Sequence, residues 1–220
     1  MKVVVYTVIT NGYDILRECL IDNPNYDYIA YVDELTPVPK NTKWQIRPIP
    51  DDIKHLNKIM QQIYIKILPH KYFPEYDISI YCDGKVQMTH DVTELLSDDM
   101  MFVSNKHPHR DCIYDECSTL SRLGFEKRNV IANVIDMLKK NNYPRHRGLF
   151  DTCMMIRRHN DPYVYEIMDQ VWQFIVDLNI TRYEIIFNYV LFLQNKTVTL
   201  IPYDFKYFVQ HPHAKTHYKF

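Results

Sequence analysis

The chain has 220 residues, of which 46% are hydrophobic and 24% charged, and its formal net charge is -1. This composition excludes wholesale disorder, and the near-neutral charge excludes a protein that holds nucleic acid through an overall positive field. The five cysteines include no Cys-x-x-Cys pair, and no apolar run approaches the roughly 18 residues of a membrane span, so we expect reduced thiols, no membrane span and a cytoplasmic location.

The first half of the sequence predicts strands and one long helix. Runs of β-branched and aromatic residues, separated by turn signals, mark strands at residues 2–10, 26–33, 44–50 and 76–82. Either Asp51 or Asp52 would cap the helix, whose apolar stripe runs from Ile53 to Ile67. Pro69 would end this helix before the next strand begins.

The second half continues the alternation of strands and helices. Strands are expected at residues 100–106, 150–158 and 198–203, and helices at 130–138, 164–175 and 184–193, with a short helical segment near 91–96. This order predicts an α/β fold, a single Rossmann-like domain over residues 1–220, with a mostly parallel central sheet and helices on both faces. Ligands of such sheets bind at the carboxyl ends of the strands, where Asp33 and Asp83 lie.

The segment "YDISIYCDGKVQM" ends an apolar strand on the single carboxylate of Asp83, followed by Gly84 and Lys85. One interpretation is an ordinary strand end that has reached water. The other is a carboxylate that binds a divalent cation or a ribose hydroxyl, since hard cations prefer oxygen ligands. Gly84 would then let a ligand approach the backbone closely.

The longer stretch "YDISIYCDGKVQMTHDVTELL" resembles the YD-S-W-x-DG-N region of a family of small GT-A-type glycosyltransferases of bacteria, plants and large algal DNA viruses. In outline, that family is similar to the retaining galactosyltransferases of glycosyltransferase family 8. The similarity continues through "KILPHKYFPEYD", "KHPHRDCIYDE", "FDTCMMIRR" and "TRYEIIFNYV". It implies a single GT-A domain that moves a sugar from a UDP-sugar donor to a glycan hydroxyl with retention. The viral members of the family also suggest a viral protein, and the cytoplasm would then be that of the host.

The resemblance implies roles at the diphosphate of the donor. Asp83 and His211 would hold Mn²⁺ or Mg²⁺, and Lys66 and Lys215 would neutralise the phosphates. In GT-A enzymes a D-x-D pair stands where this chain has Asp83-Gly84-Lys85, so one carboxylate of the pair is replaced by a cation. His213 fits the spacing of the C-terminal imidazole nearly as well as His211.

The resemblance also implies two catalytic carboxylates. Asp151 takes the place of the Asn that faces the donor sugar, and Glu184 takes the place of a Gln beneath the anomeric carbon. A carboxylate there could stabilise an oxocarbenium-like transition state or attack it. Glu184 could instead serve the dipole of the helix that it begins. Tyr183 stands where relatives have an acid.

Residues near the first two strands would hold the nucleoside, if the fold is of this type. Thr7, Thr10 and Tyr13 are expected to bind the uracil ring by hydrogen bonds and stacking, and Asp33 to bind the ribose hydroxyls. Without the resemblance these are ordinary strand and turn residues.

Two alternative functions remain open. The departures at Lys85 and Tyr183 suggest a donor-binding or scaffold domain of the same fold that has lost catalysis. The repeated "HPH", at His107–His109 and His211–His213, suggests a zinc site in a hydrolase, although no supporting carboxylates stand at metal spacing.

Overall fold

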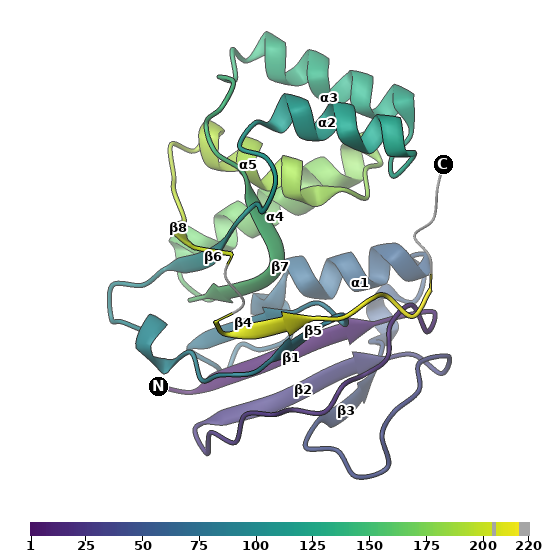
Figure 1. Ribbon diagram of the computed structural model, residues 1–220, viewed down its shortest axis with the longest axis vertical. Helices are drawn as coiled ribbons and strands as arrows, with labels where there is room; N and C mark the ends of the chain where they lie inside the picture. Colours follow the sequence, from purple (N-terminus) through teal and green to yellow (C-terminus); the bar gives the residue numbers. More distant parts are fainter. Residues whose placement is uncertain (204–205, 216–220) are drawn as a thin grey trace.

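The computed structural model describes residues 1–203 and 206–215 and contains a central seven-stranded sheet (Figure 1). In spatial order its strands are β3 (Gln45–Pro48), β2 (Tyr26–Val32), β1 (Val3–Ile9), β4 (Ile78–Cys82), β7 (Phe150–Arg157), β6 (Phe102–Lys106) and β8 (Thr199–Ile201). Only β7 runs antiparallel to its neighbours, so the predicted mostly parallel sheet is confirmed. A strand buried on both faces reads as a continuous apolar run, which explains why "VVVYTVI" of β1 was recognisable.

The helices pack against one face of the sheet. They are α1 (Lys58–Ile67), α2 (Ile113–Leu123), α3 (Arg128–Lys140), α4 (Pro162–Leu178) and α5 (Tyr183–Leu193). Alternate side chains of β1, namely Val4, Tyr6 and Val8, belong to the same core cluster as buried residues of all these helices. In Figure 1, α2 and α3 lie together beyond α4 and α5, at the end of the molecule farthest from β3.

Among the described residues, no α-helix contributes to the core cluster on the opposite face of the sheet, whereas helices were expected on both faces. Val3 and Val5 of β1 pack there against a small second sheet of β5 (Val86–Met88) and β9 (Phe208–Gln210) and against the short 3-10 helix η3 (Thr93–Leu95). Figure 1 shows β9 crossing in front of the central sheet beside β5. Strand β9, which the sequence patterns did not predict, thereby ties the C-terminal segment to this face.

The start of the first helix differs from the prediction. Asp51 and Asp52 form a separate 3-10 helix, η1 (Asp51–Ile53), and neither caps α1. Asn57 is the N-cap, and its side chain accepts a hydrogen bond from the backbone N–H of Met60 at 3.0 Å. Helix α1 ends at Ile67, two residues before Pro69, as predicted, and a further 3-10 helix, η2 (Pro69–Lys71), follows it.

Helix α2 was not predicted. Its sequence, "IYDECSTLSRL", buries only Ile113, Glu116, Cys117 and Leu120, so its apolar stripe is too short to stand out. Among the residues that the structure describes, no helix combines the length and apolar character that crossing a membrane requires.

Candidate functional site

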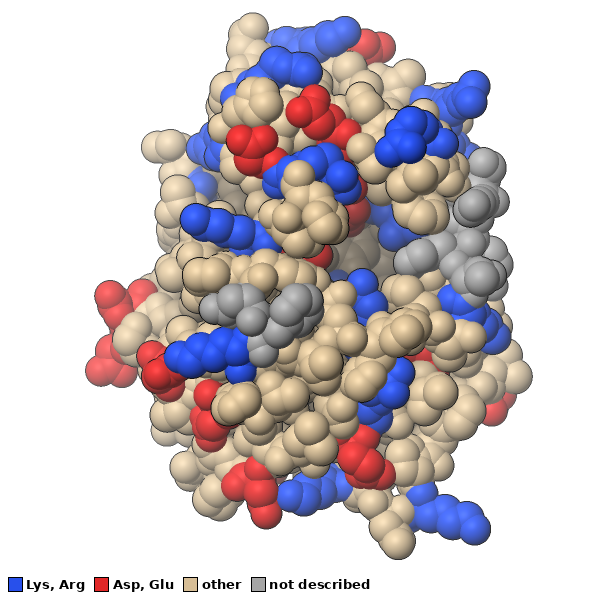
Figure 2. Space-filling view, in the orientation of Figure 1, with Lys and Arg blue, Asp and Glu red and all other residues tan. Residues whose placement is uncertain are grey.

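A cleft of about 230 Å³ opens where β1 and β4 end and where α1 and α5 begin. Its lining includes Tyr13 and Asp14 after β1, Asp83 and Lys85 after β4, and Tyr183 at the start of α5. Figure 2 shows the molecule hollowed between the helices and the sheet, with acidic and basic side chains around the hollow. The cleft lies at the sheet edge where ligands of parallel sheets bind.

Asp83 lies in this cleft next to a buried cation. Its Oδ1 accepts hydrogen bonds from Lys66 Nζ at 2.7 Å and from the Tyr81 hydroxyl at 2.8 Å. The Lys66 ammonium also lies 4.5 Å from the ring centroid of Tyr81 and 4.7 Å from that of Tyr183. Burial acts to lower the pKa of Lys66, but the Asp83 charge and Tyr183 outweigh burial and raise that pKa above its usual range. Asp83 and Lys66 therefore form a fixed ion pair, with the Lys66 ammonium beside the rings of Tyr81 and Tyr183. We call this arrangement the Asp83 corner.

The chain reaches this arrangement through α1 and the turn after β4. Lys66 lies in the last turn of α1, and its side chain is fully buried, as Ile65 and Ile67 are. The turn at Gly84 packs closely, since a Cβ there would lie 2.8 Å from the Asp14 Cβ. Gly84 is thus required for contact between the β4 turn and the loop after β1, whether or not a ligand is bound.

A second buried cation, Arg157 of β7, lies behind Lys66. Its guanidinium donates hydrogen bonds to the Tyr6 hydroxyl at 2.5 Å and to the Lys66 carbonyl at 3.1 Å. Burial lowers the pKa of Arg157 from its usual value and raises the pKa of Tyr6 to about 12. These contacts fix the end of α1, and with it the position of the Lys66 side chain.

The nucleoside residues expected near β1 divide into two groups. Tyr13 and Thr10 line the cleft, although the Thr10 hydroxyl donates to the Lys58 carbonyl at 2.7 Å. Thr7 lies on the other face of β1, beside a separate cavity of about 20 Å³, and the structure does not bring it to the cleft.

Asp33 is buried beside the cleft and is not among the residues that line it. Its carboxylate accepts from the Asn11 backbone N–H at 2.7 Å and from the Thr36 hydroxyl at 2.9 Å, and it pairs with Lys58 at 3.1 Å. Burial acts to raise the pKa of Asp33, but these donors hold it below its usual range. The carboxylate thus organises the loop that carries Asn11.

The C-terminal segment brings His213, and not His211, to the cleft. His213 Nδ1 lies 2.9 Å from Asp14 Oδ1, and its ring packs 4.9 Å from that of Tyr13. His211 Nε2 instead lies 3.0 Å from Gln87 Oε1 in β5. Lys215 closes over the rim, where its ammonium donates to the carbonyl of Asn11.

Glu184 and Asp151 are not among the residues that line the cleft, although Glu184 directly follows Tyr183, which does line it. Burial raises the pKa of Glu184 to about 7, with Arg182 acting to lower it and the charges of Glu116 and Asp151 acting to raise it further. Asp151 Oδ1 accepts from the backbone N–H of Cys153 at 2.6 Å. A carboxyl group with a pKa near neutrality can carry or lose a proton at physiological pH.

Sequence reasoning missed several cleft residues, namely Asn11, Asp14, Lys58, Gln62, Phe125, Thr181 and Arg182. Arg182 precedes α5, and its Nε donates to the Phe125 carbonyl at 3.2 Å. It stands beside Tyr183 and Glu184 in the sequence, so the start of α5 was the available signal. Lys58 and Gln62 lie one helical turn apart on α1, a spacing that predicts a shared face.

The cleft offers few ligands for a resident divalent metal. Within the described residues, the hydrogen bonds to the Asp83 carboxylate go to Oδ1, one of them from Lys66, and Lys85 adds a second cation close by in the sequence. Among described residues, the ligand atoms of Asp83, Asp14 and His213 do not gather as a group of three. The cleft therefore fits a cation-neutralised anion better than a protein-held metal ion, and Mn²⁺ or Mg²⁺ on Asp83 and His211 remains a prediction.

The imidazoles of the two "HPH" segments do not meet. His107 Nε2 lies 3.7 Å from Glu116, and Nδ1 of the same ring accepts from the backbone N–H of His109 at 3.3 Å. Within the described ranges, none of these imidazoles belongs to a group of three metal-ligating side chains. This arrangement gives no support to a zinc hydrolase site built from them.

Solved structures of glycosyltransferases share this fold. Mouse xyloside xylosyltransferase 1, in its apo form, is 9% identical with a TM-score of 0.53, and the match covers 93% of this chain and 86% of that one. The apo structure of WbbM, a bifunctional glycosyltransferase, is 13% identical with a TM-score of 0.56, over 91% of this chain and 38% of that one. At such identities the likeness shows the fold, and the GT-A architecture is confirmed.

The curated proteins compared with the chain include no match. The likeness to glycosyltransferase family 8, the viral origin and the cytoplasmic location remain predictions. The sequence model of the TOD1/MUCI70 glycosyltransferase-like domain matches residues 1–209, nearly the whole chain. The chain belongs to the TOD1/MUCI70 glycosyltransferase-like family.

Proposed function

We propose that the protein transfers a sugar from a UDP-sugar to a hydroxyl group of a glycan, with retention of the anomeric configuration. The observation that carries the proposal is the Asp83 corner, where a strand-end carboxylate and a buried lysine lie 2.7 Å apart in a cleft at the carboxyl edge of the sheet. A nucleotide diphosphate has hydroxyls for the carboxylate and negative charge for the cations around it.

The nucleoside end of the donor would lie against the loop after β1. Tyr13 brings an aromatic ring to the lining there, and this ring packs 4.9 Å from that of His213. Thr10 shapes this wall through its bond to the Lys58 carbonyl. Among the described residues, the hydrogen bonds to the Asp83 carboxylate reach Oδ1, so the other carboxylate oxygen could accept from a ribose hydroxyl.

The diphosphate would lie among the cations of the cleft. Lys85, Arg182 and Lys58 line it, Lys66 lies beneath Asp83, and Lys215 reaches its rim. Charge-assisted hydrogen bonds from such groups strengthen as negative charge develops on the departing phosphate. Bound Mn²⁺ or Mg²⁺ would add Lewis-acid stabilisation of the same charge, but the proposal needs only the chain's own cations.

In the transfer, the bond between the anomeric carbon and the β-phosphate oxygen breaks, and its electron pair leaves with UDP. The acceptor oxygen forms the new bond to the anomeric carbon on the same face, and its proton passes to the departing phosphate oxygen. Glu184, ionised above its pKa of about 7, would stabilise the positive charge on the sugar. Asp151, held by the Cys153 N–H, would contact sugar hydroxyls.

Calorimetry and product analysis test this proposal. UDP should bind the parent protein. Asp83→Ala should weaken UDP binding by about tenfold or more, because the variant lacks the carboxylate contact to the ribose hydroxyl and no longer holds the Lys66 ammonium in place. The matched control is Asp98→Ala, which removes an exposed acid of the loop before β6. Absence of UDP binding, with or without Mn²⁺, or equal binding by Asp83→Ala, would contradict the proposal.

A second candidate function is binding of the donor without turnover. It is favoured by Tyr183, whose ring centroid lies 4.7 Å from Lys66 Nζ at a position where the resemblance to known glycosyltransferases implies an acid. This candidate predicts UDP binding with no transfer product from any donor. Detection of a glycosylated acceptor by mass spectrometry would eliminate it.

A further inference from the structure

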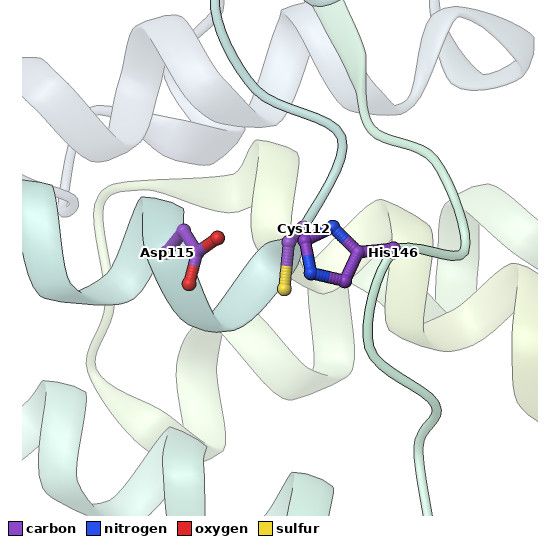
Figure 3. A group of neighbouring side chains, drawn as sticks. All are labelled: Cys112, Asp115 and His146. Carbon is purple, nitrogen blue, oxygen red and sulfur yellow. The ribbon is translucent and has the colours of Figure 1, made fainter.

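Three side chains with metal-ligating atoms meet where α2 begins, outside the lining of the cleft. Figure 3 shows the Cys112 thiol, the Asp115 carboxylate and the His146 ring facing one another. One ligand atom from each lies within 4.8 Å of the other two. Among the residues that the structure describes, this is the group of three His, Cys, Asp or Glu side chains that gathers so closely.

The backbone holds the two contributing segments together without a metal. Cys112 is the N-cap of α2, and Asp115 follows one helical turn later. His146 comes from the segment before β7, which is fastened by a hydrogen bond from Gly148 N–H to the Asp111 carbonyl at 2.9 Å. The ligands are therefore brought close by the fold and need little further ordering.

Asp111 orients the His146 ring. The His146 Nδ1 lies 2.9 Å from Asp111 Oδ1, so a proton on Nδ1 donates to this carboxylate and leaves the Nε2 lone pair for a ligand. A carboxylate behind an imidazole is the usual support of a metal-ligating histidine. Arg145 pairs with Oδ1 of Asp115 at 3.3 Å, which leaves the second oxygen of that carboxylate for the ion.

We propose that Cys112, Asp115 and His146 bind a zinc ion. A thiolate, an imidazole and a carboxylate form a donor set that suits Zn²⁺, whereas Mg²⁺ and Ca²⁺ prefer oxygen ligands alone. Ligand atoms on tetrahedral zinc lie roughly 3.5 Å apart. The three ligand atoms now lie within 4.8 Å of one another. Since His146 is exposed and Asp115 is half-buried, both side chains can move closer to the Cys112 thiol. On binding, the Cys112 thiol loses its proton to solvent, and a water molecule completes the tetrahedron.

The ion would fasten the start of α2 to the segment that leads into β7. That segment continues to Asp151 in β7. The backbone N–H of His107, which follows β6, donates to the Leu149 carbonyl of the same segment at 2.9 Å. A bound ion would therefore stabilise the chain that leads to Asp151, at a place separate from Asp83. The site does not depend on the proposed transferase reaction.

Cobalt substitution tests the site. The metal-free protein should take up one equivalent of Co²⁺ with a thiolate-to-cobalt charge-transfer band, and Zn²⁺ should displace the cobalt. Cys112→Ser should abolish the band, and His146→Ala should weaken metal binding by about tenfold or more. Thermal unfolding of both variants without metal shows whether they fold.

Two control variants separate this site from others. Cys19→Ser removes a half-buried thiol elsewhere and should keep the band, as should Asp83→Asn in the cleft. Competition with a chromogenic chelator gives the Zn²⁺ affinity of each variant. No charge-transfer band in the parent, or a band that survives Cys112→Ser or disappears in Cys19→Ser, would overturn the proposal.

Discussion

Replacement of Asp83 by Asn removes the charge that stabilises the buried ammonium of Lys66. The two groups lie 2.7 Å apart, and the side chains are 24% and 0% exposed, respectively. Breaking a buried ion pair from one side costs about 3–5 kcal/mol. The partial exposure of Asp83 and the two aromatic rings around Lys66 reduce this cost, so we expect a loss of about 2–3 kcal/mol in the free energy of unfolding at pH 7.

The loss should shrink as the pH rises. In the parent, folding raises the pKa of Lys66. The stability that this shift contributes is therefore complete below the lysine pKa of the unfolded chain, about 10.4, and is lost only at higher pH. In the variant, burial acts without its opposing charge and lowers the pKa of Lys66. The folded variant then binds fewer protons than the unfolded chain, and its stability rises with pH.

Urea denaturation between pH 7 and about 9.5 measures both effects. The control is Asp14→Asn, which changes another carboxylate of the cleft, one that contacts His213 and forms no ion pair with a lysine among the described residues. Its deficit should not change over this range. An Asp83→Asn protein as stable as the parent, or one with a deficit independent of pH, would show that Asp83 does not stabilise the buried ammonium of Lys66.

Three further predictions concern the cleft. Gly84→Ala should lower the free energy of unfolding by about 1–3 kcal/mol, because the added Cβ would lie 2.8 Å from the Asp14 Cβ; an unchanged urea midpoint would contradict this packing. If ionised Glu184 supports the transition state, the transfer rate should rise with pH through about 7. Glu184→Gln should remove that titration. Because the folded state raises the pKa of Glu184, the free energy of unfolding should fall between pH 4.5 and about 7 in the parent, and Glu184→Gln should make this fall smaller. Arg182→Gln should weaken UDP binding about tenfold in calorimetry, whereas equal affinity would place the diphosphate away from the start of α5.

The sequence was informative where local chemistry and tertiary position agree. The apolar run before Asp83 predicted both a buried strand and a carboxylate at its end, and β4 ends at Cys82. It could not show that Lys66 is fully buried, because a lysine late in an amphipathic helix is usually solvated. That position depends on Arg157 and Tyr6, which lie far away in the sequence.

The C-terminal imidazoles show the same limit. The sequence spacing admits either His211 or His213 at the cleft. The choice is made by pairing of β9 with β5, which places the His211 N–H 2.8 Å from the Lys85 carbonyl and leaves His213 to reach Asp14. Register between distant strands is set by tertiary packing, so local patterns do not contain it.

A crystal structure of the protein with bound UDP is the most direct test of whether the Asp83 corner binds the charged end of a sugar nucleotide. The diphosphate should lie among Lys85, Arg182 and Lys58, with a ribose hydroxyl or a phosphate-bound ion against Asp83. Density for UDP anywhere else on the protein would contradict this prediction.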